Sequence, residues 1–209
     1  EILRCLVGSE MCIRDSKKYV RFRLGENMAD SIQIKHWYAC KVFFNKVFEI
    51  ERMLHESAIE CYIPCETVLV ERDGKKKKVR KPVISSLLFF RSSEKDALAI
   101  QNQLSGRILL YMRKVGFRKY PSVISDAEMN VFILVSSSGE KGLEYLSAED
   151  ADYQVGERVK VIDGPFKGAE GYIHRIKGNR RLVVSIQGVC AVATSYIPQC
   201  FLRKIAPDE

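Results

Sequence analysis

The stretch from Gly156 to Gly168 constrains the fold of this chain more than any other. Apolar and polar residues alternate from Arg158 to Val161, as in a strand with one buried face. The chain then enters Asp163-Gly164-Pro165-Phe166, a turn that needs glycine and proline at fixed places. Further short strand signals follow, so we predict strands at 158–162, 170–177, 180–186, 189–194 and 202–205. Short strands so closely spaced predict a small β-barrel.

The composition is that of a globular protein with room for one or two domains. The chain has 209 residues, of which 46% are hydrophobic and 29% are charged, and its net charge is +8. The positive charge favours polyanionic partners or acidic protein surfaces, although a solvated basic surface is the commoner meaning of a modest excess. The longest apolar runs, 84–90 and 131–135, are too short to span a bilayer, so no membrane partner is expected.

The cysteines do not form a metal-binding pattern. They number seven, an odd count, and their spacings are irregular. Cys61 and Cys65 are the only close pair, with His55 upstream, and a zinc site would want a second pair at ligand spacing. We therefore predict free thiols in a reducing cytoplasm, with neither a metal nor a cofactor.

The first 27 residues are set apart from the rest. Glu1 to Ser16 shows no clear helix or strand period and no signal-peptide layout. The stretch resembles translated sequencing-adapter sequence, so we expect residues 1–27 to be non-native and Met28 to be the true start. The alternative, a native disordered tail, stays open.

Residues 34–135 combine helix and strand signals. We predict strands at 36–44, 60–64, 87–91 and 108–115, and a hairpin of 67–72 with 75–81 around Asp73-Gly74. Helices are predicted from Val47, from Ser93, and from the capping box Ser125-x-x-Glu128 to Val135. Residues 136–151 are small, polar and acidic, which predicts a linker to the barrel at 152–206.

Catalytic motifs are missing from the sequence. It contains no Gly-x-Ser-x-Gly, no Walker-type phosphate loop and no His-Glu-x-x-His. The three histidines belong to three different predicted elements, so the chain is not expected to be an enzyme.

The order of these elements resembles the NusG family of transcription elongation factors over residues 34–205. The resemblance rests on His36-Trp37-Tyr38-Ala39, the basic Asp-Gly hairpin, the helix start at Ile124-Ser125-Asp126-x-Glu128, and the stretch 156–168, which is similar to the KOW motif. It implies an α+β protein. An N-terminal NGN-like α/β sandwich, an antiparallel sheet with helices, is followed by a small SH3-like five-stranded β-barrel, the KOW domain.

The resemblance also implies a function. Family members bind the clamp of RNA polymerase through an apolar concave surface and suppress pausing or termination. They contact non-template DNA or nascent RNA, and their KOW domain docks a ribosomal protein or a termination factor. The alternative is an RNA-binding or ribosome-associated KOW protein that uses its barrel and basic hairpins directly.

Two departures from the family pattern point to a specialised member. General factors carry Phe-Pro-Gly-Tyr where this chain has Ile84-Ser85-Ser86-Leu87, and an exposed aromatic where it has Gln187. The chain is therefore similar to antiterminators that act on long capsular polysaccharide operons.

Three groups of candidate site residues follow. The apolar polymerase-binding candidates are Trp37, Tyr38, Phe43, Ile84 and Leu87. Strand residues alternate faces, so at most half of those on one strand serve one surface, and each has ordinary core as its alternative. The nucleic-acid candidates are Lys41, Lys46, Arg72, Lys75, Lys76, Lys77 and Lys78. For those on the predicted hairpin, Arg72 and the four lysines 75–78, the alternative is a solvated hairpin that blocks edge pairing.

The third group forms the KOW motif. Its members are Val161, Asp163, Gly164, Pro165, Phe166, Gly168 and Gly171. The glycines and the proline are expected to build the turn, and Phe166 is either a partner-facing aromatic or the lid of the barrel core.

Overall fold

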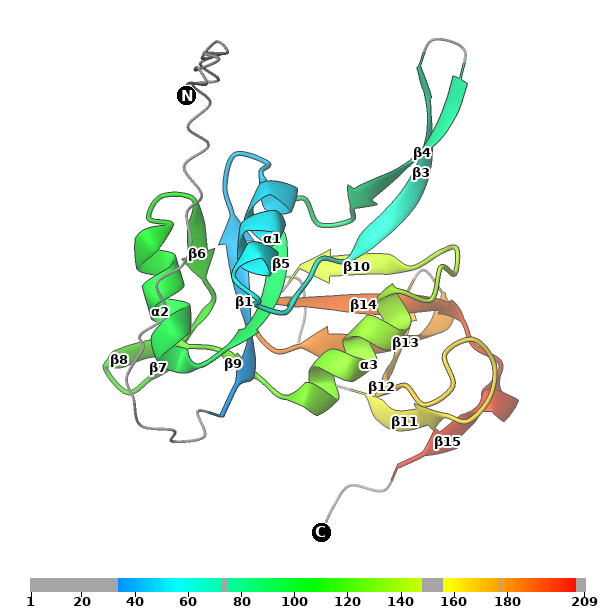
Figure 1. The fold of residues 1–209 in the computed structure, drawn as a ribbon. Coiled ribbons are helices and arrows are strands. Elements are labelled where there is room, and N and C mark those ends of the chain that lie inside the picture. The colour runs from blue at the N-terminus through cyan, green and yellow to red at the C-terminus, as the bar shows by residue number, and fades with distance from the viewer. Residues whose placement is uncertain (1–33, 73–74, 148–155, 177, 206–209) are drawn as a thin grey trace, which may run out of the picture.

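The computed structural model describes residues 34–72, 75–147, 156–176 and 178–205. It combines helices with antiparallel sheets (Figure 1). The segment expected to be non-native, 1–27, lies outside the described residues. Within the described ranges, no helix is both long and apolar enough to cross a membrane.

The N-terminal half is built on a five-stranded antiparallel sheet. Its strand order is β2 (Cys61–Tyr62), β5 (Leu87–Ser92), β1 (His36–Val42) and β6 (Ile108–Leu110), and β9 (Val123–Ile124) also pairs with β1. Aromatic and branched side chains favour strands here, and both faces of β1 and β5 are buried. A sheet buried on both faces needs a cover on each side.

Two helices cover one face of this sheet. They are α1 (Val47–Glu56) and α2 (Glu94–Gln103), and α2 begins where the Ser93 side chain accepts a hydrogen bond from the Asp96 amide. Their apolar side chains, Ile50 and Ile100 among them, pack on Tyr38 and Phe90. This cluster forms the first core.

The third helix, α3 (Asp126–Ser136), lies against the opposite face. It begins at a complete capping box, in which Ser125 and Glu128 satisfy each other's backbone amides. Met129 and Phe132 pack on Ala39 and Phe89, and the Phe89 and Phe132 rings lie 5.4 Å apart. The predicted third helix is therefore confirmed.

The C-terminal half is a six-stranded antiparallel sheet. Its strand order is β10 (Glu144–Ser147), β14 (Cys190–Tyr196), β13 (Asn179–Ile186), β12 (Glu170–Ile176), β11 (Glu157–Val161) and β15 (Leu202–Lys204), and a short 3-10 helix, Gln199–Phe201, precedes β15. The five predicted strands are confirmed. The sixth strand, β10, lies inside the stretch expected to be a linker, where it pairs with β14.

Helix α3 lies between the two halves of the molecule. It contacts β1 on one side and β13 and β14 on the other. As a result, the apolar residues of the first sheet's α3 face and those of the C-terminal sheet belong to one buried cluster. The order of layers is α1 and α2, first sheet, α3, C-terminal sheet (Figure 1).

Two hairpins extend from the N-terminal half. One consists of β3 (Cys65–Arg72) and β4 (Lys75–Pro82), as predicted, and it projects well beyond the sheets (Figure 1). The other consists of β7 (Met112–Val115) and β8 (Arg118–Pro121). The continuous strand predicted at 108–115 is therefore wrong: the chain leaves the sheet at Tyr111, whose carbonyl accepts from the Ser122 amide instead.

Candidate functional site

Three of the five apolar candidates lie together beside α3. Trp37 and Leu87 belong to the buried cluster around Phe132, and they are 4% and 1% exposed. Ile84 is half-buried and packs against the same cluster from the turn before β5. The structure therefore brings Trp37, Ile84 and Leu87 to one face of the first sheet.

The other two apolar candidates lie elsewhere. Tyr38 points to the opposite face, where it is 1% exposed and its ring lies 6.2 Å from that of Phe90. Its hydroxyl has a raised pKa because it is buried and Glu94 is near. Phe43 follows β1, is half-buried, and contacts the exposed ring of Phe44. Tyr38 is a core residue and contributes nothing to the face that carries Trp37.

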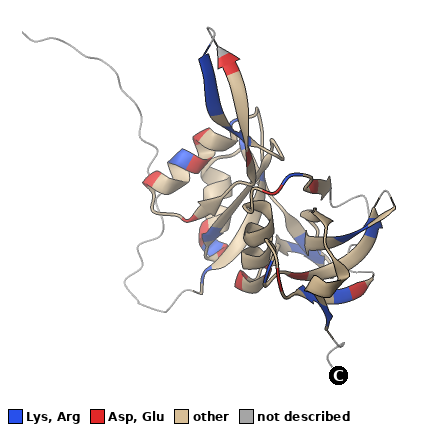
Figure 2. Cartoon of the chain, turned by 90° about the vertical axis from the view of Figure 1, so that its right-hand side faces the viewer, with Lys and Arg blue, Asp and Glu red and all other residues tan. Residues whose placement is uncertain are grey.

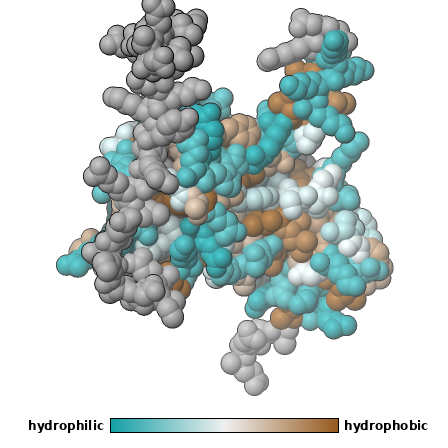
Figure 3. Space-filling view, viewed as in Figure 1, coloured by the Kyte–Doolittle hydropathy of each residue, from teal (hydrophilic) through white to brown (hydrophobic). Residues whose placement is uncertain are grey.

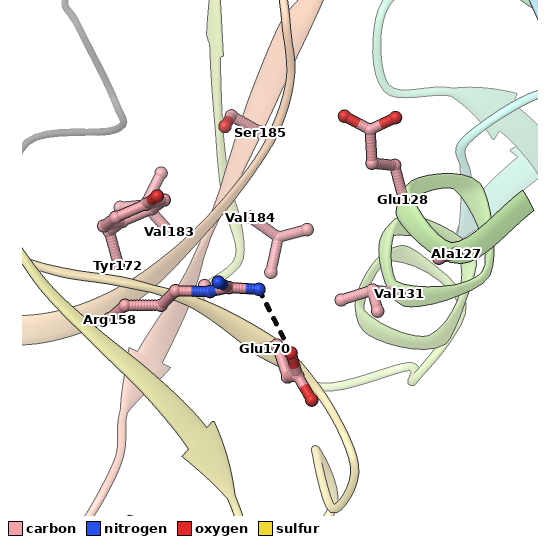
Figure 4. Close-up of a pocket in the computed structure, with 10 residues that line it drawn as sticks. Ala127, Glu128, Val131, Arg158, Glu170, Tyr172, Val183, Val184 and Ser185 are labelled. Carbon is pink, nitrogen blue, oxygen red and sulfur yellow. Dashed lines mark ion pairs between the residues drawn. The ribbon is translucent and has the colours of Figure 1, made fainter. Parts of the chain in front are cut away.

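The C-terminal sheet covers part of the α3 region. A crevice between them is lined on one side by Ala127, Glu128 and Val131 of α3 (Figure 4). On the other side lie residues of β11, β12 and β13, where Arg158 pairs with Glu170 at 3.6 Å. Figure 4 shows Val131 directed from α3 toward the sheet side of this crevice. Val131 thus lies on the side of α3 that faces the C-terminal half.

A hydroxyl chain connects β2, α3 and β10. The Tyr62 hydroxyl lies 2.7 Å from the Ser136 hydroxyl, and the Tyr145 hydroxyl donates to the Ser136 carbonyl at 3.4 Å. Burial raises the pKa of both tyrosines, so both hydroxyls are neutral at physiological pH. The strand found within the expected linker is therefore attached to the end of α3 as well as to β14.

The β3–β4 hairpin carries most of the basic candidates. Lys75, Lys76, Lys77 and Lys78 are exposed on β4, and within the described part of the chain none of them forms an ion pair. Figure 2 shows β4 as a blue strand rising from the molecule, and Figure 3 shows apolar side chains among the hydrophilic ones on this hairpin. The exposed apolar residues are Leu69 and Val79.

The base of this hairpin is fixed to α1. Arg80 pairs with Glu51, and its guanidinium lies 5.1 Å from the centre of the Phe48 ring. The lysines of β4 therefore project from a hairpin whose base is held against α1.

The remaining basic candidates are more dispersed. Lys41 is exposed on β1, and Lys46 forms an ion pair with Glu49 at 3.3 Å. Arg72 pairs with Lys75 in the strand register, and only its backbone is described. Lys41 and Lys46 therefore belong to other parts of the chain than the lysines of β4.

The predicted KOW motif forms the turn after β11. Val161 and Phe166 are buried, whereas Asp163 and Pro165 are exposed, and the Asp163 carboxylate accepts from the Gly164 amide at 2.8 Å. Phe166 is 3% exposed and belongs to the core, which resolves its two predicted roles in favour of packing.

Two glycines of the motif have backbones in the left-handed region, and a third is enclosed. Gly164 and Gly168 have φ values of +83° and +94°. Gly171 faces β13 so closely that an added Cβ would lie 2.4 Å from the Val183 carbonyl oxygen. The motif residues therefore build the turn and its packing.

The Cys61 thiol is not a reactive group of the kind that nucleophilic catalysis needs. The Cys61 thiol lies 3.4 Å from His55, but burial, with a contribution from Glu51, raises its pKa to about 12. The thiol is therefore protonated at neutral pH, and only the thiolate is a nucleophile. Among the described residues, no group of three or more His, Cys, Asp or Glu side chains could hold a metal ion.

Sequence reasoning missed the β7–β8 hairpin. Its tip is Gly116-Phe117, a two-residue turn in which only the glycine has a positive φ, and the Phe117 side chain is fully exposed. The signal that could have revealed it is a glycine-containing pair between two short basic segments, 112–115 and 118–121.

Comparisons with known proteins give one consistent family. Residues 35–133 match the family described as "Transcription termination factor nusG". Over 176 residues the chain is 24% identical to the "Transcription termination/antitermination protein NusG" of Streptococcus pyogenes serotype M3 and of serotype M1, covering 79% of this chain and 94% of each relative. A solved structure, "Domain interaction in Thermotoga maritima NusG", is 18% identical and covers 82% of this chain and 98% of its own, with a TM-score of 0.39.

Proposed function

Because the chain belongs to the NusG family of transcription termination and antitermination factors, we propose that it is a cytoplasmic, non-enzymatic factor that binds the clamp of RNA polymerase. It restrains the clamp and thereby suppresses pausing or termination. It does so by using binding energy to favour one state of a conformational equilibrium, and it needs no catalytic group.

The observation that carries this proposal is the convergence of Trp37, Ile84 and Leu87 on one face. These three residues share the buried cluster beside α3, whereas Tyr38 belongs to the core on the other side of the sheet. Ile84 and Leu87 occupy the two ends of the stretch that stands where general factors of the family carry Phe-Pro-Gly-Tyr. An apolar face of this kind suits a protein partner better than a nucleic acid.

In this arrangement the proposed polymerase-binding face is closed. Leu87 is 1% exposed, and the cluster that buries it also contains Leu182 and Val184 of the C-terminal sheet. Clamp binding through Leu87 therefore requires the segments that cover it to move away from this face of the first sheet. The polymerase must supply enough differential binding energy to favour the open state.

The C-terminal half is proposed to be an SH3-like KOW barrel, formed by the five strands other than β10. The turn at 163–168 and the enclosed Gly171 support this assignment. Because Gln187 is an exposed polar residue where general factors have an aromatic, contacts with a ribosomal protein or a termination factor are expected to differ from theirs.

The β3–β4 hairpin is proposed to contact non-template DNA or nascent RNA. Lys75, Lys76, Lys77 and Lys78 project without internal ion pairs among the described residues, so they are free to neutralise phosphates. We further propose that the factor acts on particular long operons, such as those for capsular polysaccharides. The ground for this is the Ile84-Ser85-Ser86-Leu87 stretch, which departs from the Phe-Pro-Gly-Tyr of general factors.

A pull-down with core RNA polymerase tests the proposal. The unmutated chain is expected to retain polymerase, and Ile84→Asp is expected to lose it. Ile84 is only half-buried, so this variant should fold, whereas an aspartate at the fully buried Leu87 would disturb the core. Ile162→Asp, the same change at an exposed position in the C-terminal half, is the matched control. Failure of the unmutated chain to retain polymerase would refute the proposal.

A further inference from the structure

The β7–β8 hairpin has a composition unlike that of the rest of the molecule. It holds Arg113, Lys114, Arg118 and Lys119, and all four side chains are exposed. Within the described residues, none of them forms an ion pair. No aspartate or glutamate occurs anywhere from residue 97 to residue 125. The hairpin therefore concentrates positive charge that no ion pair among the described residues neutralises.

Exposed aromatic rings accompany these cations. Phe117 at the tip has no cover at all, and Tyr120 on β8 is exposed too. A phenylalanine exposed in this way does not stabilise the fold, because its apolar surface stays in water after folding. The Gly116-Phe117 turn holds the ring at the extreme end of a paired ribbon, where a flat ligand can reach it.

The strand register gives the two faces of the hairpin different chemistry. Opposite residues share a face, so Arg113 and Tyr120 lie together with Val115 and Arg118. The other face carries the directly opposed Lys114 and Lys119 with Met112 and Pro121. Each face thus combines cations with apolar or aromatic surface, and Phe117 lies where the two faces meet.

We infer that the β7–β8 hairpin is a binding site for single-stranded nucleic acid. Its cations would follow the phosphate backbone, and Phe117 would stack on an unpaired base. Stacking needs a base whose face is accessible, which a duplex offers only at its ends or after unpairing. An acidic protein surface would satisfy the cations but would leave the exposed ring without a flat partner.

This site is separate from the basic β3–β4 hairpin. The two hairpins arise at different places on the N-terminal half, and β4 has no aromatic residue to accompany its lysines (Figure 1). The inference is also independent of the polymerase contact proposed above. It is tested without polymerase, so its failure and the failure of that proposal are distinguishable.

Fluorescence anisotropy with three labelled probes tests the inference: a 12-nucleotide thymidine DNA, the matching uridine RNA, and a 12-base-pair DNA duplex. The full chain is expected to bind at least one single strand more tightly than the duplex. Phe117→Ala is expected to weaken that binding about tenfold, the effect of losing one stacked base. Whichever single-stranded probe binds more tightly, the DNA or the RNA, shows which nucleic acid the hairpin prefers.

Charge and fold are controlled separately. Lys114→Gln with Lys119→Gln is expected to lower the slope of log affinity against log salt by about 1.4, because each phosphate that is no longer neutralised lowers it by about 0.7. Lys95→Gln with Lys167→Gln removes the same charge from two exposed positions outside the hairpin and should leave that slope unchanged.

Tyr196→Ala, which removes an exposed aromatic ring of β14, is the control for Phe117→Ala and should leave the affinity unchanged. Equal affinity for the duplex and both single strands, or an unchanged affinity of folded Phe117→Ala, would overturn the inference.

Discussion

Arg80 donates two hydrogen bonds to Glu51, one to each carboxylate oxygen, at 3.1 and 2.9 Å. These bonds join the base of the β3–β4 hairpin to α1, and the Glu51 side chain is only 13% exposed. A two-stranded ribbon is barely stable by itself in water. This forked pair, with Phe48 beneath the guanidinium, therefore gives the hairpin a defined direction.

Arg80→Ala is expected to lower the free energy of unfolding by about 1 kcal/mol, because it leaves a partly buried carboxylate without its partner. Urea denaturation gives this value, and hydrogen exchange across residues 65–82 should be faster in the variant. Lys81→Ala is the control, since Lys81 and Glu66 are both well exposed and 3.9 Å apart. Equal effects of the two substitutions would contradict the anchoring role of Arg80.

Val131→Asp is expected to open the molecule. It places a charge on the side of α3 that faces the C-terminal sheet, whereas the residues that hold α3 on the first sheet, Met129 and Phe132, are untouched. Amides of β13 should then exchange faster, and core polymerase should bind several-fold more tightly, because less of the binding energy is consumed by opening. Asn130→Asp, an exposed neighbour on the same helix, is the matched control. Unchanged polymerase affinity in an opened Val131→Asp variant would show that closure does not limit binding.

Gly171→Ala is expected to destabilise the C-terminal sheet by about 2 kcal/mol, because the new methyl group would overlap the Val183 carbonyl. Gly168→Ala meets no neighbouring atom and should cost about 1 kcal/mol, the strain of its φ of +94° alone. Thermal unfolding of the two variants compares the effects. A smaller loss for Gly171→Ala than for Gly168→Ala would contradict the close approach of β12 and β13.

Stability is expected to fall as the pH rises above about 9, in part through Cys190. Burial raises the pKa of this thiol from an ordinary value of 9.0 to about 12. Between these values the folded chain holds a proton that the unfolded chain has released, so the stabilisation present below pH 9 is lost progressively toward pH 12. Denaturant unfolding from pH 8 to 11 should show a shallower decline for Cys190→Ala than for the unmutated chain. Parallel declines would contradict this assignment.

The strands, helices and basic hairpin were largely predictable because each has a local pattern. The capping box at Ser125 and Glu128 is a contact within four residues, and the β3–β4 turn is marked by Asp-Gly. Period-two alternation also predicted that Trp37 and Tyr38 would face opposite ways. It could not tell which of them lies beside α3.

The remaining features depend on contacts between distant segments. The strand Glu144–Ser147 has a weak local pattern and exists because β14 offers it a free edge. The burial of Leu87 depends on α3 and the C-terminal sheet, which follow it by many residues in the chain. The exit of the chain at Tyr111, which produces the β7–β8 hairpin, is likewise set by pairing with Ala39 and Ser122.

Site-specific photocrosslinking tests the central claim most directly. p-Benzoylphenylalanine in place of Ile84, incubated with core RNA polymerase and irradiated, is expected to crosslink to the clamp. The same group in place of the exposed Ile162 of the C-terminal half should not. Mass spectrometry of the crosslinked peptides identifies the polymerase segment. Crosslinks from position 84 confined to the clamp are the predicted result. An absence of polymerase crosslinks from position 84, or equal crosslinking from both positions, would contradict the proposed polymerase-binding face.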